Sequence, residues 1–125
     1  MTNKLQVPNG QKTRIYDLEE RTFQFAKNFV FYYKKLPKTV SNIEYGKQLI
    51  RASGSQAANY IEANEALSKK DFVHRIRICR KEAKESGLWL KLAEPYGGEI
   101  EEQKNLIREN EELRKIFSSI LAKSQ

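Results

Sequence analysis

Six basic side chains in the third quarter of this 125-residue chain have a spacing suited to phosphate binding. They are Lys70, His74, Arg77, Lys81, Lys84 and Lys91. Their separations of 4, 3, 4, 3 and 7 residues place all of them on one face of a helix. Such a row of cations can contact the phosphates of a nucleic acid and gain affinity by releasing counterions. A solvated helix surface is the alternative, because exposed basic faces are common.

Five polar residues form a second line, which we call the polar seam. They are Gln48, Arg51, Ser55, Asn59 and Glu62, separated by 3, 4, 4 and 3 residues. Small residues surround them, among them Gly54, which costs ~1 kcal/mol relative to alanine inside a helix. The close approach of another helix could offset that cost. We therefore expect the seam to hydrogen-bond across two helices and to fix their register, with direct ligand contact as the alternative.

No group of residues indicates catalysis or metal binding. His74 follows Asp71 by one helical turn, but neither a nucleophile nor an oxyanion donor is implied beside them. Cys79 is the single cysteine and His74 the single histidine, so no zinc site is expected. We expect no catalytic residue and no cofactor, and we expect Cys79 to be a small buried side chain.

The overall composition favours an anionic partner inside the cell. The net charge is +7, and the basic excess lies in residues 1–40 (8 basic, 3 acidic) and 68–98 (8 basic, 4 acidic). No segment approaches the roughly 20 apolar residues that cross a bilayer, and the first residues lack the apolar run of a signal peptide. We expect a cytoplasmic protein without a membrane partner.

Capping signals and prolines divide the chain into four helices. Asp17, Ser41 and Ser68 each precede an acidic residue by three positions, which is typical of a helix N-terminus. Pro37 and Pro95 fall where apolar patterns end. The predicted helices span about 17–36, 42–66, 69–94 and 99–123. Their short connections predict an all-α fold, an antiparallel up-and-down four-helix bundle over 15–125 that follows a flexible arm at 1–14.

The first predicted helix is apolar around much of its circumference. One face carries Leu18, Phe25, Phe29, Tyr32 and Leu36. An adjoining stripe carries Phe23, Ala26, Val30 and Tyr33. We expect the first face to be core, and we leave Phe31, Tyr32 and Tyr33 open as contacts between subunits.

Three motifs resemble those of a known family. They are QLIRASGSQAANYIEA from Gln48, SKKDF from Ser68 and KEAKESGLWL from Lys81. Together they resemble the bacterial four-helix bundle proteins encoded in intervening sequences of 23S ribosomal RNA genes, over about residues 16–121. The chain keeps the family pattern at Gln48, Arg51, Ser55, Ala58, Asn59, Glu62, Ala63, Asp71, Phe72, Glu82, Glu85, Trp89 and Leu90. It departs at Gln56 and Ala57, where isoleucine and glycine are frequent in the family.

The resemblance implies a ring-like homopentamer. It also implies kinship with the accessory protein of diversity-generating retroelements, a basic pentameric bundle that binds nucleic acid and partners a reverse transcriptase. We therefore expect a non-enzymatic homo-oligomer that binds RNA or DNA through backbone phosphates, as an accessory factor to a nucleic-acid enzyme. The alternative is an interaction scaffold for a protein partner, with no nucleic-acid role and with its charge serving solubility.

Overall fold

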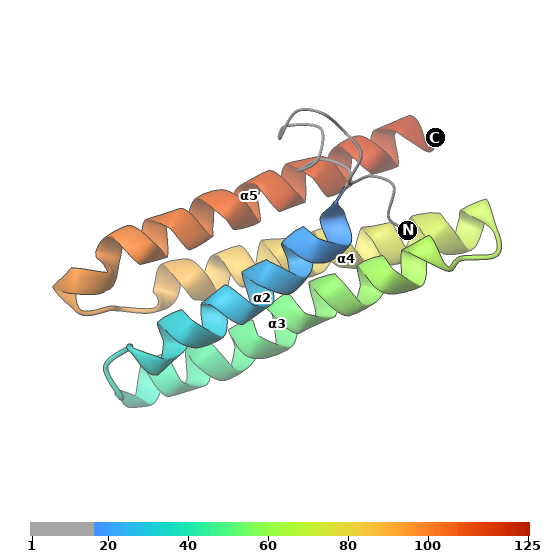
Figure 1. Cartoon of the computed structure of the whole chain (residues 1–125). Helices are drawn as coiled ribbons and strands as arrows, with labels where there is room; N and C mark the ends of the chain where they lie inside the picture. Colours follow the sequence, from blue (N-terminus) through green and yellow to red (C-terminus); the bar gives the residue numbers. More distant parts are fainter. Residues whose placement is uncertain (1–16) are drawn as a thin grey trace.

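Four long helices make up the part of the chain that the computed structural model describes, residues 17–125 (Figure 1). They are α2 (Leu18–Lys34), α3 (Val40–Asn64), α4 (Lys69–Leu92) and α5 (Ile100–Lys123). A short 3₁₀ turn, η2 (Gly97–Glu99), leads into α5. The expected flexible arm at 1–14 lies outside the described residues.

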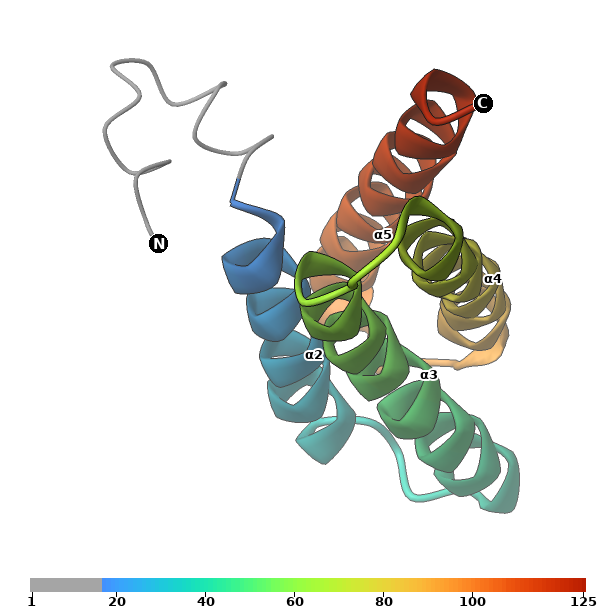
Figure 2. The same cartoon turned by 90° about the vertical axis from the view of Figure 1, so that its right-hand side faces the viewer.

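Successive helices run in opposite directions and pack side by side. The α2–α3 and α4–α5 connections lie at one end, and the α3–α4 connection lies at the other (Figure 1). Helix α3 packs against α2 and α4, helix α4 also packs against α5, and the contact between α2 and α5 is the weakest of the four. Figure 2 shows α2 and α4 on opposite sides of α3. The predicted antiparallel four-helix bundle is confirmed.

The helix starts follow local capping chemistry. Ser68 caps α4 as predicted, because its side-chain oxygen accepts a hydrogen bond from the backbone N–H of Asp71 at 3.1 Å. The predicted cap at Ser41 is wrong, since Thr39 caps α3 by accepting from the backbone N–H of Asn42 at 3.1 Å. Asp17 is the N-cap residue of α2, but its side chain makes no capping hydrogen bond.

One buried asparagine links the α2–α3 connection to the residues that follow the C-terminus of α4. The side-chain amide of Asn42 donates to the carbonyl oxygens of Pro37 at 3.0 Å and Glu94 at 2.9 Å. Its side-chain oxygen accepts from the backbone N–H of Glu94 at 2.9 Å. The two connections at this end of the bundle are therefore held together, and the start of α3 is fixed relative to the end of α4.

The core includes the apolar face predicted for the first helix. All five of its residues are buried, four on α2 and Leu36 just after the helix ends, and Phe29 and Tyr32 are fully enclosed. On the adjoining stripe Ala26, Val30 and Tyr33 are half-buried, whereas Phe23 is 51% exposed. Phe31 is also 51% exposed and Tyr33 is half-buried, whereas the burial of Tyr32 removes it as a contact between subunits.

Close helix approach occurs at Gly46 rather than at Gly54. A Cβ atom on Gly46 would lie 2.0 Å from the ring of Tyr33, so any larger residue would displace this ring where α3 meets α2. A Cβ atom on Gly54 would meet nothing within 4 Å. The prediction that Gly54 allows a close helix contact is therefore wrong within this chain, because Gly54 lies on the exposed side of α3.

A buried hydrogen-bond network joins α3, α4 and α5 at mid-height. Gln56 donates from its side-chain amide to Ser86 Oγ at 3.0 Å and to Asn110 Oδ1 at 3.1 Å. Asn110 in turn donates to the carbonyl oxygen of Ala83 at 2.8 Å. Gln56, Ser86 and Asn110 are each at most 2% exposed. These hydrogen bonds connect side chains on three helices, so they fix the alignment of the helices.

Cys79 is buried as predicted, between α4 and α3. Its thiol donates to the carbonyl oxygen of Gln56 at 3.6 Å, and burial raises the pKa of the thiol to about 12. The thiol therefore stays protonated and shielded at neutral pH, which makes it a poor nucleophile in the folded chain.

Candidate nucleic-acid interface

The six predicted basic residues all lie on α4, and the side chain of each is exposed. They are Lys70, His74, Arg77, Lys81, Lys84 and Lys91, and we call this surface the basic face of α4. The opposite side of the helix carries Ile76, Cys79, Ala83 and Leu90, which are fully buried. Burial of that side orients the helix, so the cations point away from the bundle. This satisfies the geometric condition for phosphate contact.

The α3 side of the basic face carries two carboxylates, and Arg51 pairs with both. Its guanidinium lies 2.8 Å from Glu85 Oε1 and 3.5 Å from Glu82 Oε1. Glu82 is buried, whereas Glu85 is half-buried. The negative charges of these two α4 carboxylates are thereby partly compensated, which reduces their repulsion of a phosphate.

Two of the five residues of the polar seam bond to α4. Arg51 forms the pairs described above, and Asn59 accepts a hydrogen bond from the guanidinium of Arg75 at 3.0 Å. Ser55 holds the Asn59 amide by accepting from it at 3.0 Å. Gln48 and Glu62 are exposed at the two ends of the seam. The contacts thus run between α3 and α4, but Ser55 and Asn59 are only half-buried, and the fully buried polar residue of α3 in this region is Gln56.

The α5 side of the basic face opens into a groove that sequence reasoning missed. The groove has a volume of about 350 Å³ and is lined by Ala83, Lys84, Gly87, Leu88, Lys91, Asn110, Glu111 and Arg114. A Cβ atom on Gly87 would lie 3.2 Å from Asn110 Nδ2. Because Gly87 has no side chain, the space above Asn110 stays open in the groove. Arg114 adds a cation from α5 to the Lys84 and Lys91 side chains of the basic face.

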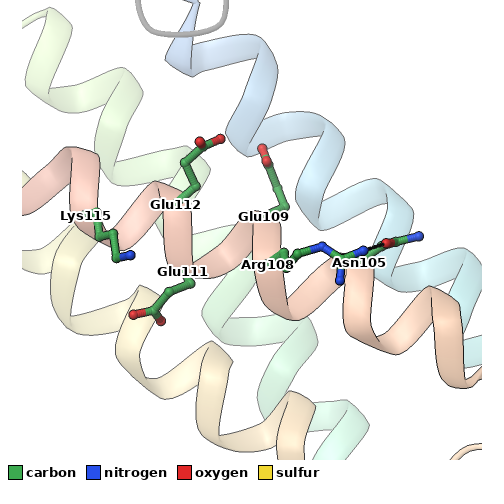
Figure 3. Close-up of a pocket in the computed structure, with 6 residues that line it drawn as sticks. All are labelled: Asn105, Arg108, Glu109, Glu111, Glu112 and Lys115. Atoms are coloured by element: carbon green, nitrogen blue, oxygen red, sulfur yellow. Dashed lines mark hydrogen bonds between the residues drawn. The ribbon is translucent and has the colours of Figure 1, made fainter.

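The part of the α5 surface shown in Figure 3 has a different character. It is lined by Asn105, Arg108, Glu109, Glu111, Glu112 and Lys115. Glu109 and Glu112 point toward α2 (Figure 3). Both pair with Arg21 of that helix, at 2.7 and 2.5 Å. Glu111 extends to the opposite side of α5, toward α4. The α2 side of α5 therefore carries two carboxylates that are already paired with Arg21, whereas the α4 side carries Glu111 beside Arg114.

The geometry gives no support for a catalytic role of His74. Both His74 and Asp71 are exposed, and the backbone N–H of Asp71 is bound by the Ser68 cap. Across residues 17–125, no three or more His, Cys, Asp or Glu side chains gather closely enough to hold a metal ion. None of the helices in the same range has the length and apolar character needed to span a membrane.

The fold and its exposed cations define a class, the basic all-α proteins built as an antiparallel four-helix bundle. The family model described as 23S rRNA-intervening sequence protein matches residues 15–119, and the chain belongs to this family. Among solved structures, it is similar to a protein of unknown function from the S23 ribosomal protein family of Bacteroides thetaiotaomicron. The two share 27% identity with a TM-score of 0.71, over 86% of this chain and 97% of the other. No curated protein matches the sequence.

Proposed function

We propose that this protein is a non-enzymatic, cytoplasmic homo-oligomer that binds RNA or DNA through backbone phosphates. The observation that carries the proposal is the basic face of α4, where five lysine or arginine side chains and His74 are exposed on one uninterrupted helix. The residues from Lys70 to Lys91 span about 30 Å at 1.5 Å per residue. A strand lying along that distance presents several phosphates, and each neutralised phosphate adds counterion release to the affinity.

The chemistry of this face favours weak sequence selectivity. Lysine and arginine contacts to phosphates position a nucleic acid but carry no base information. The exposed apolar side chains of α4, Leu88 and Leu92, offer no hydrogen bonds to base edges. Binding should therefore follow charge and backbone geometry, with RNA and DNA both accepted.

Self-assembly is the second part of the proposal, and exposed apolar side chains support it. Phe23 and Phe31 are each 51% exposed on α2, and Ile50 and Ile61 are 43% and 49% exposed on α3. These positions lie on α2 and α3 rather than on α4, so copies of the chain could associate through them and leave the basic face open. We propose a homopentamer, the state implied by the family resemblance. A ring would present five basic faces to one strand, and multivalency would strengthen binding. In that form the protein would serve as an accessory factor to a nucleic-acid enzyme, such as a reverse transcriptase.

The proposal predicts retention of the purified protein on heparin and on immobilised RNA at 50 mM salt. Elution should occur as salt rises, because the phosphate contacts are screened and their counterions return. Light scattering on the eluted peak should give a mass five times that of the 14.6 kDa chain. A protein that assembles but flows through both columns would favour the scaffold alternative and contradict the nucleic-acid role.

A further inference from the structure

The groove between α4 and α5 combines features that the basic face alone lacks. It is concave, and side chains from two helices line it. Lys84 and Lys91 contribute from α4, and Arg114 contributes from α5. A guanidinium presents donors in a planar fork that matches two oxygens of a phosphate, whereas an ammonium group acts as a point charge. The groove therefore offers a directional donor beside two cations.

Glu111 is the one carboxylate in the groove lining, and it already binds Arg114. The Arg114 guanidinium donates to Glu111 Oε2 through both Nε and Nη2. This hydrogen bonding, with Lys115 and Lys91 nearby, lowers the pKa of Glu111. The carboxylate thus stays ionised and occupies the fork in the free protein. A phosphate entering the groove would offer two oxygens to the two Arg114 donors that now share one carboxylate oxygen, and Lys84 and Lys91 would supply attraction from the other wall.

The floor of the groove would let a ligand approach the bundle closely. Gly87 has no side chain, and Ala83 is buried beneath the surface. Asn110 is held in place because its amide donates to Ala83 and its oxygen accepts from Gln56. The buried network therefore makes the floor rigid, while Leu88 provides a half-exposed apolar edge. Such an edge suits the sugar that adjoins a phosphate.

We infer that this groove binds one phosphate group of a nucleic-acid strand. On binding, Arg114 releases its hydrogen bonds to Glu111 and donates to the phosphate oxygens instead. The inference rests on the proposed function, because the strand that it seats is the one held along α4. The bound phosphate adds a contact from α5 to those from α4. This contact would fix the position of the strand along α4. An internal phosphodiester and a terminal phosphate share the required chemistry.

Two substitutions with matched controls on the same helix test the groove. Arg114→Lys keeps the charge and removes the fork, and Arg108→Lys makes the same change on the exposed arginine outside the groove. We expect Arg114→Lys to weaken oligonucleotide binding about fivefold, the value of one lost charge-assisted contact. Arg108→Lys should leave affinity unchanged.

Removing the competing carboxylate should have the opposite effect. Glu111→Gln frees Arg114, whereas Glu101→Gln removes one negative charge from the pair with Arg108 outside the groove, at 3.6 Å. We expect Glu111→Gln to strengthen binding more than Glu101→Gln does. Equal effects of the two glutamine variants would mean that only net charge matters and would contradict the inference.

Binding should be measured with two single strands of equal length, one with a 5′-hydroxyl and one with a 5′-phosphate. If Arg114→Lys weakens both equally, the groove seats an internal phosphodiester; if it weakens only the phosphorylated strand, the groove seats the terminal phosphate. Either result supports the inference. If Arg114→Lys matches Arg108→Lys with both strands while the wild-type protein binds them, the groove is not a phosphate seat. If the wild-type protein binds neither strand, the proposed function itself fails.

Discussion

Replacing Arg77, Lys81 and Lys84 by alanine should weaken RNA binding on the order of 100-fold at 50 mM salt. Each of the three side chains is exposed on the basic face of α4, so their removal eliminates phosphate contacts without disturbing the core. The plot of log affinity against log salt should become shallower by about 2 to 3, since each lost phosphate contact removes about 0.7 to 0.9 from the slope. Filter binding or fluorescence anisotropy between 50 and 200 mM salt provides the measurement.

A second triple variant separates position from charge. Lys47, Lys115 and Lys123 are also exposed, but they lie on α3 and α5 outside the basic face. Their replacement by alanine lowers the net charge by the same amount. We expect this variant to retain most of the affinity and nearly the full salt slope. Equal losses in the two triple variants would indicate diffuse attraction to the whole molecule, and unchanged binding in the first would remove the basic face of α4 as the site.

The largest loss of stability is expected for Asn110→Ala. This change removes the hydrogen bonds with Gln56 and Ala83, and it leaves a cavity where α3, α4 and α5 meet. The combined loss should lower the free energy of unfolding by about 2 to 4 kcal/mol. Urea denaturation at one fixed chain concentration measures it, because association would otherwise contribute to apparent stability.

Asn105→Ala is the matched control on the same helix. Asn105 is exposed and bonds only to Arg108 among the hydrogen bonds seen for its side chain. Its replacement should change the free energy of unfolding by less than about 0.5 kcal/mol. If the two alanine variants are equally stable, the buried network does not hold the three helices together, and the rigid floor assigned to the groove loses its basis.

The fold could be predicted from sequence because apolar spacing directly encodes which side of a helix is buried. The face from Leu18 to Leu36 on α2 was predicted residue by residue, and all five side chains are buried. The basic face of α4 followed from the same arithmetic, since residues opposite a buried face must be exposed. Helix ends were less certain, because Thr39 and Ser41 both carry a hydroxyl and only the path of the α2–α3 connection selects Thr39.

Features that depend on two or three helices could not be predicted from the spacing within one. Gly46 and Gly54 look alike in sequence, and only the position of Tyr33 distinguishes the close contact from the open surface. Gln56 is the hub of the buried network, yet it lies outside the line of polar residues predicted from spacing. Arg114 joins the groove only because the register of α5 against α4 brings it beside Lys84.

The central claim is that nucleic acid lies on the basic face of α4, and crosslinking tests it most directly. The native protein should be irradiated together with the nucleic acid that co-purifies with it. After digestion, mass spectrometry should identify the crosslinked peptides. We expect crosslinks within residues 69–92, with further ones at 110–115 if the groove is occupied. Crosslinks confined to α2 or α3 would contradict the account. So would the complete absence of crosslinks between the protein and the nucleic acid that co-purifies with it.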